Sequence, residues 1–281
     1  MTFPVFLIVL SAALLHAGWN AVIKVRLDPF LAMTLLCAAC GLIALPALCV
    51  TGLPPVAAWP WVTASIALHL GYYVCLSEAY RRADMGQIYP IARGSAPLLT
   101  ALLSLVLLRE TMSPGALAGV ALLGSGVVLL SLRGHRHSDS RNRPALGFAV
   151  LTAVMIAGYT VVDGVGARTA GQANSYVALL FVLDALPMLA LCLFRHGFAG
   201  MAPMRRFLLP GLAGGAMSLV AYWIVIWAMT VAPIPLVAAV RETSVVFAGL
   251  IAVFVLKEPF SRVRAAATAL TVLGLVLTRL F

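Results

Sequence analysis

Charged residues are scarce in this sequence. They make up 10% of its 281 residues, while hydrophobic residues make up 63%. An ordinary soluble domain is about a quarter charged, so this chain has too little polar surface to face water. The mean hydropathy of +1.05 points instead to lipid as the solvent. Because the gaps between apolar runs leave no room for a sizeable soluble domain, the sequence predicts a multi-pass membrane protein.

Motifs of the common enzyme classes are missing as well. The sequence has no Walker A loop, no GxSxG elbow, no HExxH pair and no dinucleotide fingerprint. Its five cysteines all fall inside apolar runs, where core packing explains Cys37 and Cys40 better than redox or metal chemistry does. We therefore expect no catalytic residue, no metal site and no cofactor.

Acidic residues are outnumbered by basic ones, 9 against 19, which gives a formal net charge of +10. Most of the basic residues lie in the short gaps after the first, third, fifth, seventh and ninth apolar runs. Cytoplasmic loops of membrane proteins carry such an excess. This placement favours membrane lipid over nucleic acid as a partner, and it predicts cytoplasmic odd-numbered loops with both termini outside.

The apolar runs predict an all-α integral membrane protein with ten transmembrane helices, because a bilayer needs about 20 apolar residues per helix. The first run has no basic segment before it, so we expect a retained helix and not a cleaved signal peptide. The predicted spans are residues 3–22, 31–50, 61–80, 88–108, 115–132, 145–165, 176–194, 207–230, 235–256 and 263–280.

A polar, basic segment at residues 133–144 (RGHRHSDSRNRP) divides the chain into residues 1–132 and 145–281. A shift of 148 residues lays Arg93 on Arg241 and the step Arg109-Glu110 on Lys257-Glu258. A shift of 140 lays AGWN, ending at Asn20, on AGYT, ending at Thr160. The halves are thus predicted to be repeats of five helices each. Since five is odd, the second repeat is inverted in the membrane, as in many secondary transporters.

Two motifs, HAGWN at residues 16–20 and RETSVVFA at residues 241–248, resemble the EamA-type permeases of the drug/metabolite transporter superfamily. The resemblance covers nearly the whole chain, and HAGWN and RETS together resemble a subgroup, some of whose members are associated with phosphonate utilisation. It implies solute transport through a central cavity, often export of amino acids or related metabolites. Relatives are often assigned cytoplasmic termini, which is opposite to the orientation that the loop charges predict.

Arg241 and Glu242 lie inside the ninth predicted span, about 10 Å from its start at Pro235 at roughly 1.5 Å per residue. Ionisable groups at such a depth are costly unless paired or hydrated, and they usually face a cavity or the protein interior. We interpret them as a substrate-contacting cation beside a titratable carboxylate. A structural ion pair between helices is the alternative.

Arg93 occupies the equivalent place in the fourth span, between Pro90 and Pro97, which can bend or break that helix. If the repeat holds, Arg93 and Arg241 approach one central cavity from opposite halves. Two guanidinium groups there would suit a carboxylate, phosphonate or phosphate. Alternatively, Arg93 neutralises a buried acid, Glu78 or Glu242.

His16, Trp19 and Asn20 form a second cluster near the end of the first span, where His16 and Asn20 share a helix face. They are candidates for solute binding, and His16 is also a candidate proton relay. Interfacial anchoring and helix packing explain Trp19 and Asn20 equally well.

The third span carries an aromatic stripe of His69, Tyr72, Tyr73 and Tyr80, and the eighth carries one of Tyr222, Trp223 and Trp227. Such stripes can line a cavity for an organic solute, and Tyr73, Trp223 and Trp227 are the candidate lining residues, with core or interface packing as the alternative. Asp184, in the middle of the seventh span, joins Glu242 and His16 as a candidate for proton coupling. Its alternative is a hydrogen bond to a neighbouring helix.

These observations predict a secondary transporter of a small anionic or zwitterionic metabolite in a bacterial-type inner (plasma) membrane, working by alternating access. Its partners would be a small-molecule substrate and membrane lipid. Proton coupling, export, and a monomer or a homodimer all stay open. An integral-membrane enzyme and a membrane sensor or assembly subunit without flux are the alternatives.

Overall fold

The structure, a computed structural model, describes residues 1–22, 27–82, 85–131, 143–254 and 262–280. These residues are helical almost throughout and include no β-strand. Most of the predicted linker 133–144 and the whole Lys257-Glu258 step lie outside the described residues. The last two linker residues already belong to a helix, which begins at Arg143.

Helices cover all the predicted apolar runs in order. Two short 3-10 turns, η1 (Val56–Ala58) and η3 (Ala202–Phe207), precede the third and eighth of these runs. The α-helices are α1 (Phe3–Val22), α2 (Pro29–Thr51), α3 (Trp59–Arg82), α4 (Met85–Leu107), α5 (Pro114–Ser131), α6 (Arg143–Ala170), α7 (Ala173–Met201), α8 (Leu208–Val231), α9 (Ile234–Arg241), α10 (Ser244–Phe254) and α11 (Arg262–Leu280).

The ninth run differs from the prediction, because it is two helices and not one. Helix α9 ends at Arg241, and α10 begins at Ser244. Between them, the Thr243 N–H donates to the Val240 carbonyl at 3.1 Å and the Thr243 hydroxyl donates to the same oxygen at 2.7 Å. Bonds of this i to i−3 type tighten a helix and end it. Glu242 and Thr243 therefore form a turn inside the apolar run.

Five stretches of the described residues are long and apolar enough to cross a bilayer, namely 3–20, 29–51, 143–170, 173–231 and 234–251. The fourth of these holds α7 and α8 together. Apolar helices at 92–107, 114–129 and 265–280 are shorter, and α3 is not among either group. Helix α3 carries His69, Glu78 and two C-terminal arginines, which lower its hydropathy. The structure thus shows an all-helical protein with several membrane-spanning helices.

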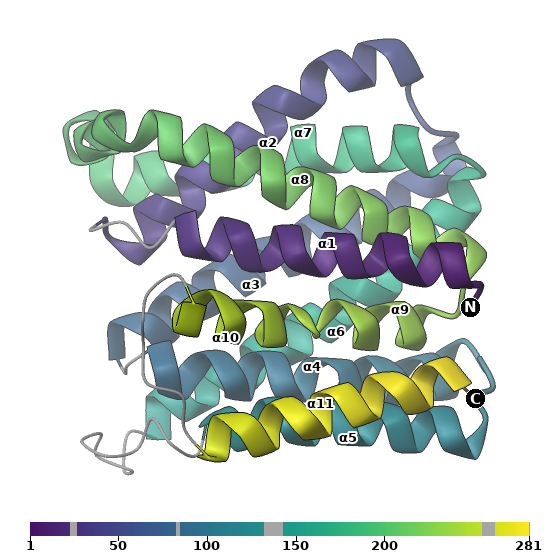
Figure 1. Cartoon of the computed structure of the whole chain (residues 1–281). Helices are drawn as coiled ribbons and strands as arrows, with labels where there is room; N and C mark the ends of the chain where they lie inside the picture. The colour runs from purple at the N-terminus through teal and green to yellow at the C-terminus, as the bar shows by residue number, and fades with distance from the viewer. Residues whose placement is uncertain (23–26, 83–84, 132–142, 255–261, 281) are drawn as a thin grey trace.

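Helices of each half pack against helices of the other half in a reciprocal pattern. Helix α1 packs on α8, while α6, its counterpart in the second half, packs on α3. Helix α1 also contacts α9 and α10, while α6 contacts α4; α2 pairs with α7, and α5 pairs with α11. This pattern is the one that two similar repeats make when a two-fold axis relates them. Both chain termini lie at one end of the molecule (Figure 1), where the Arg279 guanidinium lies over the Phe3 ring.

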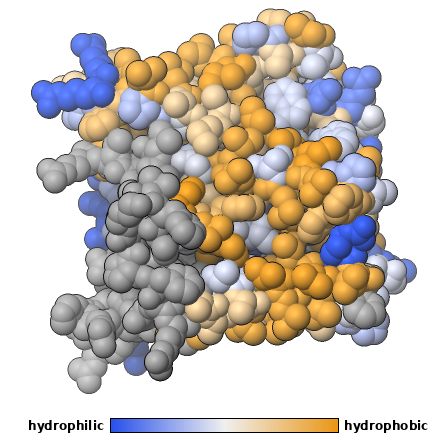
Figure 2. All heavy atoms as spheres, viewed as in Figure 1, coloured by the Kyte–Doolittle hydropathy of each residue, from blue (hydrophilic) through white to orange (hydrophobic). Residues whose placement is uncertain are grey.

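Apolar side chains cover much of the outer surface (Figure 2), with the most hydrophilic residues toward the left and right edges of the view. The exposed residues include Leu42, Leu102, Phe194 and Leu209, which are 55–88% exposed. Soluble proteins rarely expose so many large apolar side chains together. This surface fits lipid contact, so the polar groups described next must act in the interior.

Candidate functional site

Arg93, Arg241 and Glu242 form one buried ionic cluster. Helix α4 supplies Arg93, Arg241 is the last residue of α9, and Glu242 lies in the turn before α10. The Glu242 Oε1 atom accepts from Arg241 Nη2 at 3.2 Å and Nε at 3.3 Å, and it lies 3.6 Å from Arg93 Nη1. Both arginines are 4% exposed and Glu242 is 1% exposed. The helix break therefore places the carboxylate between guanidinium groups from the two halves.

The charges of this cluster do not cancel. Two guanidinium groups share a single carboxylate, which leaves one positive charge in excess among the three residues. The second carboxylate oxygen, Glu242 Oε2, is buried and has no hydrogen-bond partner among the described residues. Burying unequal charges is costly. Such an arrangement can bind an anion, whose charge would complete the balance.

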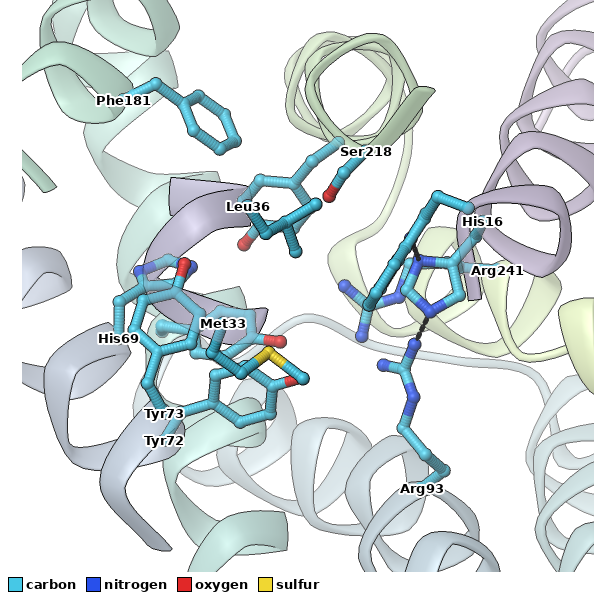
Figure 3. A pocket seen from close by; sticks show the side chains of 13 residues that line it. His16, Met33, Leu36, His69, Tyr72, Tyr73, Arg93, Phe181, Ser218 and Arg241 are labelled. Carbon is cyan, nitrogen blue, oxygen red and sulfur yellow. Dashed lines mark hydrogen bonds between the residues drawn. The ribbon is translucent and has the colours of Figure 1, made fainter. Parts of the chain in front are cut away.

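His16 and Trp19 of α1 adjoin this cluster. The Trp19 indole N–H donates to His16 Nδ1 at 3.1 Å, and the two rings meet edge to face at 5.2 Å. The other ring nitrogen, His16 Nε2, is in contact with Arg93 Nη2 (Figure 3). Asn20 donates to the His16 backbone carbonyl at 2.7 Å, within α1. His16 is thus held by its own helix on one side and faces Arg93 on the other.

A small cavity of about 60 Å³ lies beside these residues. In Figure 3, His16, Arg93 and Arg241 lie on the right, and His69, Tyr72 and Tyr73 lie on the left. The lining comes from helices of both halves: His16, Trp19, Met33, Leu36, His69, Tyr72, Tyr73, Arg93, Tyr159, Phe181, Ser218, Tyr222 and Arg241. One end of the cavity is therefore cationic and the other aromatic.

Tyr159 and Tyr222 line the cavity as well. Tyr222 belongs to the aromatic stripe predicted on the eighth span, whereas Tyr159 was not among the candidate lining residues. The Tyr159 ring stacks on His69 with centroids 4.1 Å apart, and Tyr222 meets His69 edge-on at 5.8 Å. The internal repeat holds the signal for Tyr159, because the shift of 140 residues lays it on Trp19, which also lines the cavity. The Arg241 Cζ atom lies 5.9 Å from the Tyr222 ring centroid, which connects the two ends.

Two buried carboxyl groups lie behind the tyrosines. The Tyr73 hydroxyl donates to Asp184 Oδ2 at 2.9 Å, while Asp184 Oδ1 is buried without a hydrogen-bond partner in the described part of the chain. Asp163 accepts from the Tyr222 hydroxyl at 2.6 Å and the Tyr176 hydroxyl at 3.0 Å. One tyrosine, Tyr73 or Tyr222, thus separates each carboxyl group from the cavity.

Other candidate residues lie away from the cavity. The Trp223 indole donates to Asn174 Oδ1 at 2.9 Å, and Trp227 packs against the apolar cluster around α1 and α8. Neither lines the cavity, and neither does Asn20. For Arg93, the structure provides Glu242 as the ionic partner and places Glu78 elsewhere. The described residues contain no group of three or more His, Cys, Asp or Glu side chains that could hold a metal ion.

Among the residues that the structure describes, an ionic contact joins the halves at each end of the molecule. At the end with the termini, Glu110 Oε1 accepts from Arg168 Nη1 at 2.5 Å, and Glu110 Oε2 accepts from the Ile234 backbone N–H at 3.0 Å. At the opposite end, Glu78 Oε1 of α3 lies 3.7 Å from Arg195 Nη1 of α7. Glu110 and Glu78 belong to the first half, whereas Arg168 and Arg195 belong to the second. The central cavity therefore lies between two ionic contacts, each of which joins the halves.

Comparison with known proteins agrees with this architecture. The family model of the EamA-like transporter family matches residues 3–132 and 143–280. A solved crystal structure of a protein that is 22% identical in sequence superposes with a TM-score of 0.79, covering 99% of this chain and 98% of that chain. At this level of identity the likeness concerns the fold alone. Curated proteins give no significant match.

Proposed function

Because this chain belongs to the EamA-like transporter family, and is thus a multi-pass membrane protein of transporter type, we propose that it carries a small anionic or zwitterionic metabolite. The observation that supports this is that Arg93 and Arg241, which both line a cavity, share the single carboxylate of Glu242, which does not line it. An anionic group on the solute neutralises the positive charge in excess in a site of low dielectric, where charge pairing is strongest.

The solute would bind between two inverted five-helix repeats that together span the membrane ten times. The exchange of helix partners between the halves supports a two-fold relation, and α9–α10 is a broken helix of the kind found at transporter midplane sites. Rocking of one half against the other would open the site alternately to each side. The membrane is then a bacterial-type inner membrane, with the odd-numbered loops in the cytoplasm.

The driving force would be an ion gradient or the solute gradient itself, since the sequence has no ATP-binding motif. Asp184 and Glu242 are the carboxyl groups best placed to couple transport to protons. Each is buried and has one oxygen without a hydrogen-bond partner in the described structure. A proton can therefore bind there without breaking an existing hydrogen bond.

Counterflow in proteoliposomes tests the proposal. Vesicles containing the purified protein are loaded with an unlabelled amino acid, organic anion or phosphonate, and entry of the labelled compound is followed. We expect exchange for at least one compound, and its loss in Arg241→Ala. The matched control is Arg206→Ala, which removes an exposed arginine from η3.

An Arg241→Ala protein that is monodisperse and exchanges solute at the wild-type rate contradicts the proposed site. A variant that aggregates in detergent favours a structural ion pair instead. Wild-type protein that exchanges none of the compounds, while a bound candidate still raises its melting temperature, favours a sensor without flux.

A further inference from the structure

Both ring nitrogens of His16 face hydrogen-bond donors, which a neutral imidazole cannot satisfy. A neutral imidazole has one nitrogen that donates and one that accepts. Nδ1 faces the indole N–H of Trp19, and Nε2 faces the guanidinium of Arg93. Both neighbours only donate, because indole and guanidinium have no acceptor. One ring nitrogen of His16 must therefore carry a hydrogen that points at another donor.

The Trp19 contact decides which nitrogen carries the hydrogen. Trp19 and His16 are three residues apart on α1 and therefore neighbours on the helix surface, and the indole N–H donates to Nδ1 at 3.1 Å. Arg93 reaches the ring on a long side chain from another helix, and it already has Glu242 as an ionic partner. Nδ1 is then the acceptor, and the hydrogen lies on Nε2. The contact between Nε2 and Arg93 joins two donors, and an acceptor placed between them would satisfy both.

We infer that His16 is a specificity-determining residue whose Nε2–H donates to an oxygen of the substrate's anionic group, alongside the guanidinium of Arg93. The inference rests on the proposed anion site and adds to it a neutral donor of fixed direction. Trp19 is the positioning residue, because its indole N–H holds the ring in the tautomer that can donate. His16 then acts as a hydrogen-bond donor and not as a proton carrier.

The charges and the space favour a small oxyanion that carries one negative charge. The ionic cluster has one positive charge in excess, and His16 adds a hydrogen but no charge. The cavity of about 60 Å³ has room for a carboxylate-sized group. The Glu242 carboxylate already demonstrates the geometry, because one of its oxygens lies between both guanidinium groups. A monocarboxylate therefore fits the site better than a dianion.

Acetate is a suitable probe, with acetamide as the uncharged control of similar shape. The purified protein is titrated at pH 7.5 with each compound, and the rise in melting temperature gives the apparent affinity. We expect acetate to stabilise the wild type and acetamide to have no effect. His16→Ala should weaken acetate binding by roughly tenfold to a hundredfold, the range for one hydrogen bond to a charged group.

His16→Gln separates donation from protonation. Its side-chain N–H can take the place of Nε2–H, but glutamine does not titrate, so this variant should keep most of the acetate affinity. Trp19→Phe keeps an aromatic ring beside His16 and removes the N–H, so its acetate affinity should fall below that of His16→Gln. Loss of acetate binding in His16→Gln as complete as in His16→Ala would overturn the role as a donor.

Nitrogen-15 spectra of histidine-labelled protein read the tautomer directly. The His16 signals are those absent from the His16→Gln spectrum, and we expect a hydrogen on Nε2 without ligand. A hydrogen on Nδ1, or on both nitrogens at pH 7.5, overturns the inference. If acetate binding falls in Arg241→Ala but not in His16→Ala, the anion site stands and His16 has no part in it. If acetate does not stabilise the wild type, the anion site and the inference both fail.

Discussion

At the scale of single residues, Glu242 acts as an internal anion for two arginines, so its removal should have two linked effects. Glu242→Gln leaves both guanidinium groups buried without a counter-charge. Losing one partner of a buried ionic group costs about 3–5 kcal/mol. We expect a lower melting temperature and, because an added anion can replace the lost carboxylate, a larger rise with acetate than in the wild type.

Thermal unfolding in detergent, with and without acetate, measures both effects. Asp28→Asn is the control, because it removes a carboxylate that caps α2 and asparagine caps a helix about as well. A Glu242→Gln protein that acetate does not stabilise beyond the wild-type shift would show that the arginines are not open to an anion.

The role of Asp184 in proton coupling can be tested separately by substitution. Asp184→Asn can keep the hydrogen bond from Tyr73 but cannot bind and release a proton. We expect counterflow to persist and accumulation driven by a pH gradient to be lost. Tyr73→Phe, which keeps the acid, should retain coupling. If the gradient still drives accumulation in Asp184→Asn, the proton is carried elsewhere, with Glu242 the remaining carboxyl candidate.

Residue patterns predicted part of the candidate site and missed part for a physical reason. The repeat placed Arg93 and Arg241 at equivalent positions, and the structure brings both onto Glu242. The aromatic stripes were less informative, because helical periodicity shows which side chains share a face but not what that face contacts. Tyr73 and Tyr222, one from each stripe, line the cavity, whereas Trp227 packs against α1.

At the scale of helices, the break between α9 and α10 could not be predicted from helix-breaking residues. The turn at Glu242 and Thr243 contains neither proline nor glycine. Bonds from the Thr243 backbone and hydroxyl to one carbonyl form the turn, and the pairing of Glu242 with arginines of both halves accompanies it. Tertiary contacts of this kind are invisible to a pattern of apolar residues. The apolar runs themselves did locate the other helices, although α6 ends at Ala170 and α7 at Met201, beyond the predicted ends at residues 165 and 194.

The contact between α5 and α11 depends on a close approach of the two backbones. A Cβ atom on Gly274 would lie 2.6 Å from the Gly119 carbonyl oxygen and 2.7 Å from the Leu123 nitrogen. Gly274→Ala must therefore push the helices apart, and overpacking of this kind costs about 1–3 kcal/mol. We expect a clear fall in melting temperature.

Gly147→Ala provides the matched control for Gly274→Ala. It adds the same methyl group to α6, where nothing lies within 4 Å of the new Cβ. Alanine also favours a helix over glycine, so this variant should be neutral or slightly stabilised. Equal melting temperatures for the two variants would mean that α5 and α11 can separate without cost.

At the scale of the whole molecule, the ionic contacts at the two ends should bias opening in opposite directions. Glu110→Gln weakens the contact with Arg168, and Glu78→Gln weakens the contact with Arg195. A cysteine at Ser218, which lines the cavity, reports access to a membrane-impermeant thiol reagent. Glu110→Gln should raise labelling from the side of the termini, and Glu78→Gln from the other side. Labelling that changes equally from both sides in each variant would contradict this assignment.

Composition and motifs predicted the class of molecule well. The all-helical membrane protein and the family are confirmed, and the family consists of transporters. The subgroup, the substrate and the orientation of the termini stay predictions, because they depend on a few contacts at the site and on the surrounding membrane. The charges of the loops predict on which side of the membrane each loop lies, but they do not identify the substrate that binds in the cavity.

The position of Glu110 has a mechanical consequence. One of its oxygens accepts from the first N–H of α9, at Ile234, and the last residue of α9 is Arg241. Helix α9 is thus a short rod of eight residues, about 12 Å long, with the Glu110 contact at one end and Arg241 of the proposed anion site at the other. If the helix moves as a rigid unit, a displacement at Ile234 also displaces Arg241. Breaking the hydrogen bond between Glu110 and the Ile234 N–H would then move Arg241 as well. The opening of this end of the protein and the release of the solute would therefore occur together.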